Sequence, residues 1–200
     1  GILQGTPPMR VLIVNNGVRY PKNITALFPD DAVEVVPAAT VAELYPQAPH
    51  DLIVLSGSND RPIPYFRAEL EAILTWIPEQ TKPLLGICYG AELIVEAYGG
   101  KLHHLGPENK QKGFFANAVP ENSFGLPPLL CLYEGHQWII EAVAPPLYPV
   151  IPSARGILMF GHETKPQIGT IFHLEKYHSE SDGLLVFNAI LKHFHLHLTD

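Results

Sequence analysis

The sequence predicts an α/β fold of three layers, in which a mostly parallel central sheet has helices on both faces and a small antiparallel extension. Short apolar runs, typical of strands that are buried on both faces, recur through the first hundred residues. Segments of helical period separate these runs with short connections, and such alternation requires right-handed crossovers into a parallel sheet. After Gly100 the apolar segments are separated by Pro and Gly clusters, a pattern that favours antiparallel strands.

The parallel part can be divided into strands and helices in chain order. We expect strands at 9–15, 32–37, 52–55 and 83–87, and helices at 23–28, 40–45, 64–77 and 89–98. The helix at 64–77 rests on apolar residues with helical spacing, namely Phe66, Leu70, Ile73, Leu74 and Ile77. Ligands of such sheets bind beyond the carboxyl ends of the strands, so the loops after residues 15, 55 and 87 should form one rim.

The rest of the chain is expected to add strands at 113–119, 129–133, 156–160 and 167–172, and a closing helix at 182–194. Neither an internal repeat nor a low-complexity linker is visible, which predicts a single domain over residues 9–200. Residues 1–8 look irregular, and we interpret them as a disordered or cloning-derived leader.

The composition limits the classes of function. The formal net charge is -7 and Lys and Arg form no long block, so neither a nucleic-acid partner nor a membrane surface is expected. No apolar run reaches the roughly 20 residues of a membrane span. The two cysteines, Cys88 and Cys131, stand in different contexts, which favours a cytoplasmic protein with reduced thiols. Cys131 lies in an apolar run and is expected in the core.

The strongest chemical signal is the stretch Gly-Ile-Cys-Tyr-Gly at 86–90. An apolar run ends here in Gly-x-Cys-x-Gly, the cysteine version of the sharp turn that presents a nucleophile between a strand and a helix. Glycine suits positions 86 and 90 because the two backbones approach closely in such a turn. A helix N-terminus also favours a thiolate. Cys88 is therefore the predicted nucleophile.

A thiol nucleophile needs a base and usually a group that orients the base. His173 follows an apolar strand and Glu175 stands two residues further on, so the carboxylate can accept the imidazole N–H and stabilise the imidazolium. His162 with Glu163 is a competing pair. No metal site is predicted. Several histidines and aromatic residues after Gly100 are interpreted as surface, helix-end or packing residues, namely His103, His104, His193, His195, His197, Phe114, Phe115 and Trp138.

Together the two segments resemble the signatures of the class I (triad) glutamine amidotransferases, whose usual forms are Gly-x-Cys-x-Gly-x-Gln and Phe-His-Pro-Glu. Here they are Gly-Ile-Cys-Tyr-Gly-Ala-Glu and Phe-His-Leu-Glu, about 85 residues apart. Leu-Ser-Gly-Ser at 55–58 is similar to the family's Leu-Ser-Gly-Gly-Pro loop, and the likeness extends from about residue 9 to about residue 194. The resemblance implies a flavodoxin-like sheet.

The resemblance also implies a mechanism. Cys88 attacks the side-chain amide carbon of glutamine, His173 passes the thiol proton to the leaving ammonia, and Glu175 orients His173. Backbone N–H groups of Gly57 and Tyr89 form the oxyanion hole. Water then hydrolyses the γ-glutamyl thioester to glutamate.

The sequence departs from the family pattern near the nucleophile. Glu92 replaces the Gln that normally helps to hold glutamine, and Ser58-Asn59 and Leu174 replace Gly-Pro and Pro. A carboxylate at position 92 would repel the substrate's α-carboxylate unless it were protonated or paired, and would instead favour a cationic group. The predicted substrate-binding residues are Glu92, Ser58 and His136, the last in Gly-His-Gln, where many members have Ser-His-Gly-Asp.

The predicted partners are L-glutamine or another γ-glutamyl compound and a synthase subunit that receives ammonia, and no cofactor is predicted. Two alternatives remain open. One is a stand-alone hydrolase of γ-glutamyl amides or peptides that uses the same three residues, which Glu92 favours. The other is a non-catalytic binding module that keeps the fold.

Overall fold

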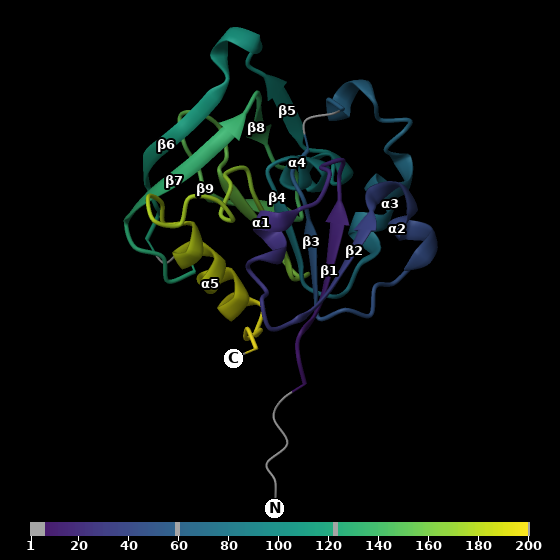
Figure 1. The fold of residues 1–200 in the computed structure, drawn as a ribbon. Coiled ribbons are helices and arrows are strands. Elements are labelled where there is room, and N and C mark those ends of the chain that lie inside the picture. The colour runs from purple at the N-terminus through teal and green to yellow at the C-terminus, as the bar shows by residue number, and fades with distance from the viewer. Residues whose placement is uncertain (1–6, 59–60, 122–123, 200) are drawn as a thin grey trace, which may run out of the picture.

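The structure, a computed structural model, describes residues 7–58, 61–121 and 124–199. Its centre is a seven-stranded sheet in the order β2-β1-β3-β4-β11-β10-β9 (Figure 1). Five strands are parallel: β2 (Ala32–Pro37), β1 (Arg10–Asn15), β3 (Leu52–Leu55), β4 (Leu84–Ile87) and β11 (Gln167–Thr170). Two antiparallel strands, β10 (Met159–His162) and β9 (Leu147–Ile151), extend this sheet.

Helices lie on both faces of the sheet, which confirms the predicted fold class. On one face α2 (Ala38–Leu44), α3 (Glu71–Glu79) and α4 (Tyr89–Ala97) pack side by side. On the other lie α1 (Lys22–Thr25) and α5 (Gly183–His193), where Phe28 after α1 stacks edge-on against Phe187 with the ring centres 5.6 Å apart (Figure 1). Strands β3, β4 and β11 are buried along their whole length, which explains why they appear in the sequence as continuous apolar runs.

The second half of the chain adds two antiparallel ribbons above the sheet. One pairs β5 (Lys101–His104) with β8 (Trp138–Ala142), and the other pairs β6 (Gln111–Ala118) with β7 (Leu129–His136). In Figure 1 the β6–β7 ribbon stands beside α5 and leads toward the carboxyl end of the central strands. A short 3₁₀ helix, Pro107–Asn109, precedes β6.

The structure corrects several sequence-based predictions. The helix predicted at 64–77 begins only with α3 at Glu71, and a 3₁₀ turn, Ile63–Tyr65, precedes it. Phe66, which follows that turn, has φ −119° and ψ 26°, so the backbone leaves the helical region before α3 begins. Strands β5, β8 and β9 were not predicted; each is short, and Pro149 stands within the apolar run of β9. The strand predicted at 156–160 begins at Met159, since Gly156 occupies the left-handed region with φ +98°.

Cys131, which was expected in the core, is only half-buried. Burial alternates along β7, and Cys131 lies on the less covered face of the two-stranded ribbon. Its thiol donates to the carbonyl of Glu180 at 3.7 Å. The prediction of a leader at 1–8 stays a prediction, because residues 1–6 lie outside the described residues. In the described part of the chain, no helix has both the length and the apolar character that crossing a bilayer requires.

Glycines at 86 and 90 allow β4 and α4 to approach each other. A Cβ atom at Gly86 would lie 2.6 Å from the carbonyl oxygen of Gly90, and one at Gly90 would lie 2.3 Å from the carbonyl oxygen of Leu55. These distances are far below any normal contact, and the atoms that would be struck belong to the backbone. The chain therefore requires glycine at both positions if α4 is to start directly above β3 and β4.

Gly90→Ala is predicted to lower the free energy of unfolding by about 2 kcal/mol or more, because the added methyl group must push α4 away from β3. The measurement is urea denaturation followed by circular dichroism. Gly135→Ala is the matched control: its Cβ would meet the side chain of Tyr133 at 3.8 Å, an ordinary contact. Equal unfolding midpoints for the two variants would contradict the role given to the close approach.

Candidate functional site

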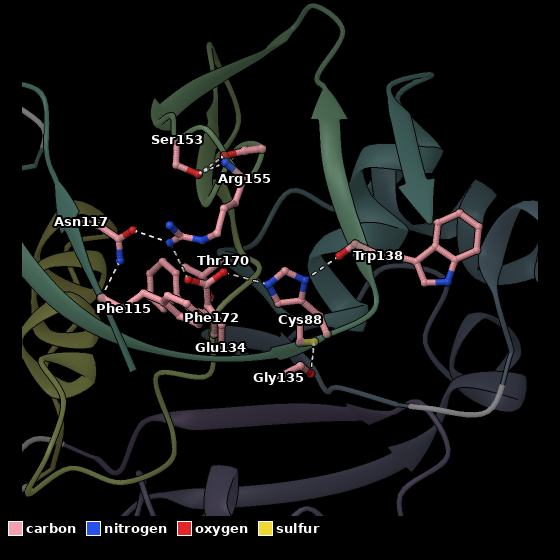
Figure 2. Close-up of polar contacts among 12 residues, drawn as sticks. Cys88, Phe115, Asn117, Glu134, Gly135, Trp138, Ser153, Arg155, Thr170 and Phe172 are labelled. Carbon is pink, nitrogen blue, oxygen red and sulfur yellow. Dashed lines mark hydrogen bonds and ion pairs between the residues drawn. The ribbon is translucent and has the colours of Figure 1, made fainter. Parts of the chain in front are cut away.

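The turn between β4 and α4 holds Cys88 in a strained backbone conformation. Its φ is +52° and its ψ is −108°, a combination that non-glycine residues rarely adopt. The backbone on either side is anchored: the Cys88 N–H donates to the carbonyl of Thr170 at 2.7 Å, and its carbonyl accepts from the N–H of Glu92 at 3.0 Å. The sulfur thus lies where β4 ends and α4 begins, and it points toward the carbonyl of Gly135, 3.9 Å away (Figure 2).

His173 and Glu175 lie beside Cys88 in the buried segment that follows β11. The strand ends at Thr170, three residues earlier than His173, so the imidazole belongs to the loop and not to the strand. The His173 ring nitrogen Nδ1 is 3.2 and 3.1 Å from the two carboxylate oxygens of Glu175. The His173 backbone N–H donates to the carbonyl of Tyr133 at 2.9 Å, which ties this loop to β7.

The electrostatics of these three side chains favour an ion pair. Burial lowers the pKa of His173, but attraction to Cys88 and Glu175 outweighs burial and raises that pKa to about 10. Burial works to raise the pKa of Glu175, yet attraction to His173 and the hydrogen bond with it bring that pKa below its ordinary value. The group therefore favours an imidazolium held by a carboxylate on one side and facing a sulfur on the other.

Gly57, which follows the end of β3, lies against the same group. A Cβ atom there would be 3.4 Å from Cε1 of His173 and 3.8 Å from Cβ of Cys88. Tyr89 follows Cys88 directly as the first residue of α4. The two residues predicted to form an oxyanion hole are thus brought next to the sulfur from two different strand ends.

Asn16 is a residue that the sequence analysis missed. Its backbone N–H donates to Oγ of Ser56 at 2.9 Å, and its side-chain amide donates to the carbonyl of Ser56 at 2.7 Å. These two bonds fix the backbone immediately before Gly57. The available signal was the Asn-Asn-Gly turn at the end of β1, one of the loops expected at this rim.

Two clefts meet at Cys88. The His173 cleft, of about 340 Å³, contains Cys88, Gly57, His173 and Glu175, and its walls include Lys22, Lys110, Lys112, Tyr133 and Lys176. The Glu92 cleft, of about 270 Å³, contains Cys88, Tyr89, Glu92 and His136, and its walls include Arg61, His104 and Trp138. Ser58, Cys88, Lys110 and Gly135 line both. Asn59, which departs from the family pattern beside Ser58, lies outside the described residues.

Glu92, the residue that departs from the family pattern, is 6% exposed at the wall of its cleft. Within the described part of the chain its carboxyl group has neither a hydrogen bond nor an ion pair. Burial raises the pKa of Glu92 to about 8, and attraction to His173 offsets this only in part. At neutral pH the side chain is therefore mostly an uncharged acid, which can donate a hydrogen bond as an amide does. The repulsion expected for a carboxylate at position 92 is largely removed.

Behind Gly135 lies a buried polar network that the sequence analysis did not find. Glu134 is fully buried and accepts from Nη2 of Arg155 at 2.8 Å, and the same guanidinium nitrogen donates to Asn117 at 2.7 Å (Figure 2). The bonds to His136 and Arg155 keep the pKa of Glu134 below its ordinary value although burial opposes them. The available signal was Glu-Gly-His at 134–136, which puts an acid and a histidine on one face of a strand.

His136 completes this network. Its Nδ1 lies 2.6 Å from the carbonyl oxygen of Trp138, and its Nε2 lies 2.9 Å from Oε1 of Glu134. A carbonyl and a carboxylate only accept, so the ring satisfies both contacts when both nitrogens carry a proton. The network thereby pins residues 134–138, which include the Gly135 carbonyl next to Cys88.

His162 and most of the remaining histidines lie away from both clefts, whereas His104 stands in the wall of the Glu92 cleft. Nδ1 of His162 accepts the backbone N–H groups of Thr164 and Lys165 at 3.0 and 2.9 Å, so that ring is occupied in a turn of its own. His103, His104, His193, His195 and His197 are exposed. Among the residues that the structure describes, no group of three or more His, Cys, Asp and Glu side chains is arranged to hold a metal ion.

Comparison with known proteins relates this chain to class-I glutamine amidotransferases and to GMP synthases. The family model for glutamine amidotransferase class-I matches residues 12–193. The glutamine-hydrolyzing GMP synthase of Thermotoga petrophila is 24% identical over 196 residues, which cover 90% of this chain but 35% of that protein. The chain thus spans about a third of the length of these full-length synthases.

Smaller relatives match along nearly their whole length. A glutamine-hydrolyzing GMP synthase subunit from Thermococcus kodakarensis is 27% identical over 176 residues, which cover 85% of this chain and 91% of that protein. The crystal structure of a putative GMP synthase subunit from Thermoplasma acidophilum shares the fold, with a TM-score of 0.78 and 23% identity over 96% of both chains.

Arg155→Leu is predicted to lower the free energy of unfolding by about 3 kcal/mol, because it leaves the fully buried Glu134 short of one cationic partner. Arg67→Leu is the matched control, since it breaks an ion pair with Glu96 in which the arginine side chain is 54% exposed. Such a pair contributes at most about 1 kcal/mol. Urea denaturation of both variants tests the difference, and equal losses would contradict the structural role of the network.

Glu92→Gln is predicted to stabilise the protein increasingly between pH 4.5 and pH 8. The folded protein retains a proton on Glu92 up to about pH 8, whereas the unfolded chain releases it near the ordinary value of 4.5. The stability that Glu92 contributes is therefore complete below pH 4.5 and is lost as the pH rises, by up to about 1.4 kcal/mol per pH unit. Glutamine does not titrate. Unfolding of both proteins at pH 4.5, 6 and 8 is the measurement, with the exposed Glu43→Gln as control, and a difference independent of pH would contradict the prediction.

Proposed function

Since the chain belongs to the class-I glutamine amidotransferase family, we propose that it hydrolyses the side-chain amide of glutamine through a thioester on Cys88 and supplies the ammonia to a synthase. The observation that carries the proposal is the grouping of Cys88, His173 and Glu175 at one end of the parallel sheet. The two ring contacts of 3.1 and 3.2 Å to Glu175 orient the imidazole toward the sulfur.

The proposed steps follow from these positions. The Cys88 sulfur attacks the amide carbon, and the N–H groups of Gly57 and Tyr89 stabilise the developing oxyanion. His173 takes the thiol proton, its raised pKa favours the protonated ring, and it then donates this proton to the leaving nitrogen as the C–N bond breaks. Water then attacks the thioester, His173 takes the proton from that water, and glutamate leaves as the C–S bond breaks.

The amino acid end of the substrate is proposed to occupy the Glu92 cleft. Arg61 supplies positive charge there for an α-carboxylate, the His136 ring lies in the same wall, and the largely uncharged Glu92 can hydrogen-bond to the carboxylate instead of repelling it. Ser58 lies at the junction of the two clefts, where the amide would sit. These positions support the substrate-binding roles proposed for Glu92, Ser58 and His136.

A partner that consumes ammonia is part of the proposal. Relatives named as single subunits of GMP synthase match over most of their length, which supports a separate synthase chain. In the full-length GMP synthases, the segment that this chain matches covers only about a third of the protein. A synthase is therefore proposed either on a separate chain or on a further domain.

Cys88→Ser is predicted to reduce glutamate release from glutamine by about 10³-fold or more, because the hydroxyl is a far weaker nucleophile than the thiolate. The measurement is a coupled glutamate assay together with mass spectrometry after labelling with a diazo-ketone analogue of glutamine. Cys131→Ser is the matched control and should keep activity within about twofold, since Cys131 lines neither cleft. A wild-type protein whose Cys88 is not labelled, or a Cys88→Ser variant with unchanged activity, would refute the proposal.

A further inference from the structure

The His173 cleft, into which the leaving group of the proposed reaction departs, has more room than ammonia needs. His173, the proposed proton donor to the leaving nitrogen, lines the cleft of about 340 Å³ and does not line the Glu92 cleft. The leaving group of an amide substrate therefore departs into the His173 cleft. Ammonia is the size of water, and one water needs only about 15 Å³ of cavity. The cleft therefore has room for a substituent much larger than ammonia.

The charge on the walls of this cleft is unusual for an acidic chain. Four of its 13 Lys and Arg residues, Lys22, Lys110, Lys112 and Lys176, converge there from α1, from the start of β6 and from the loop after Glu175. Within the described residues, none of the four forms an ion pair with a carboxylate. The acidic residue in the same wall is Glu175, and its carboxylate is already bound to His173. Glu175 attracts Lys176 as well as His173, so the excess of positive charge in this cleft comes mainly from Lys22, Lys110 and Lys112.

We infer that the site also accepts γ-glutamyl amides whose amine carries acidic groups, with the acidic amine bound among the lysines of the His173 cleft. This inference rests on the proposed function, because it uses the same thioester. The Cys88 sulfur bonds to the γ-carbonyl carbon, the C–N bond breaks, and His173 protonates the departing amine nitrogen. Water then cleaves the thioester, so the products are glutamate and the free acidic amine.

The position of the lysines favours a small ligand over an acidic protein surface. Cys88 is buried at the junction of the clefts, and the lysines surround the space that leads to it. A substituent on the substrate nitrogen must extend into that space, where the lysines attract its acidic groups. Tyr133, also in the wall, adds an aromatic surface for the aliphatic part of such an amine.

The test uses the full chain and four substrates: glutamine, γ-L-glutamyl-L-glutamate, γ-L-glutamyl-L-glutamine and γ-L-glutamyl-L-lysine. The three dipeptides have similar sizes and differ in charge. At low ionic strength kcat/KM should be highest for γ-L-glutamyl-L-glutamate, intermediate for γ-L-glutamyl-L-glutamine and lowest for γ-L-glutamyl-L-lysine. The highest and the lowest values should differ by about tenfold or more. The preference should shrink in 0.5 M salt, because salt screens the lysines.

The double variant Lys22→Gln/Lys112→Gln should lower kcat/KM for γ-L-glutamyl-L-glutamate by about tenfold and leave glutamine hydrolysis within about twofold. Lys82→Gln, an exposed lysine outside both clefts, is the matched control and should change neither. Equal rates for the three dipeptides, or a preference that survives the double variant, would overturn the inference.

Different results would refute the proposed glutamine hydrolysis and the inferred use of acidic γ-glutamyl amides. A chain that hydrolyses glutamine but none of the dipeptides keeps the proposed function and overturns this inference; the lysines would then serve an acidic partner surface. A chain that releases glutamate from none of the four substrates, and whose Cys88 resists the diazo-ketone, refutes both.

Discussion

The close approach of β4 to α4 is the constraint on which the site depends. Without a Cβ at 86 and 90, α4 starts directly against β3 and β4, and the chain can turn only if Cys88 takes a positive φ. That conformation holds the sulfur above the carboxyl end of the sheet. Because β11 pairs with β4 in parallel, the loop after β11 emerges at the same edge and brings His173 and Glu175 to it. The strain at one residue is thus supported by the packing of three strands.

The parts of the site that could be predicted from the sequence are those encoded locally. Cys88 stands in a short glycine-flanked turn, and His173 and Glu175 are two residues apart. Neighbouring residues in the sequence are therefore enough to identify all three as candidates. The apolar runs of β1, β3 and β4 were equally clear because both faces of these strands are buried. The start of α3 was not predicted, since the apolar spacing begins at Phe66 whereas the backbone becomes α-helical only at Glu71.

What could not be predicted depends on contacts between distant segments. Arg155 reaches Glu134 from another loop, and Asn16 reaches Ser56 across two strand ends, and no local pattern connects either pair. The half-buried Cys131 shows the same limit, because the covered face of the β6–β7 ribbon depends on where the ribbon lies. Burial also decides the charge of Glu92: its sequence context gave a carboxylate, whereas its surroundings favour the neutral acid.

The two clefts differ in the way they carry charge, and this difference follows from how each is built. In the Glu92 cleft the His136 ring is fixed by buried partners and the buried acid is largely neutral, while Arg61 and Lys110 stand at the exposed part of its wall. The His173 cleft is bordered by α1 and the start of β6, and most of its lysines stand on solvent-facing positions, with no ion-pair partner in the described residues. Groups fixed by buried partners suit a substrate end that is always the same. Flexible, unpaired charge suits a group that varies or departs, and this contrast supports the assignment of the acyl side and the leaving side of Cys88 to the two clefts.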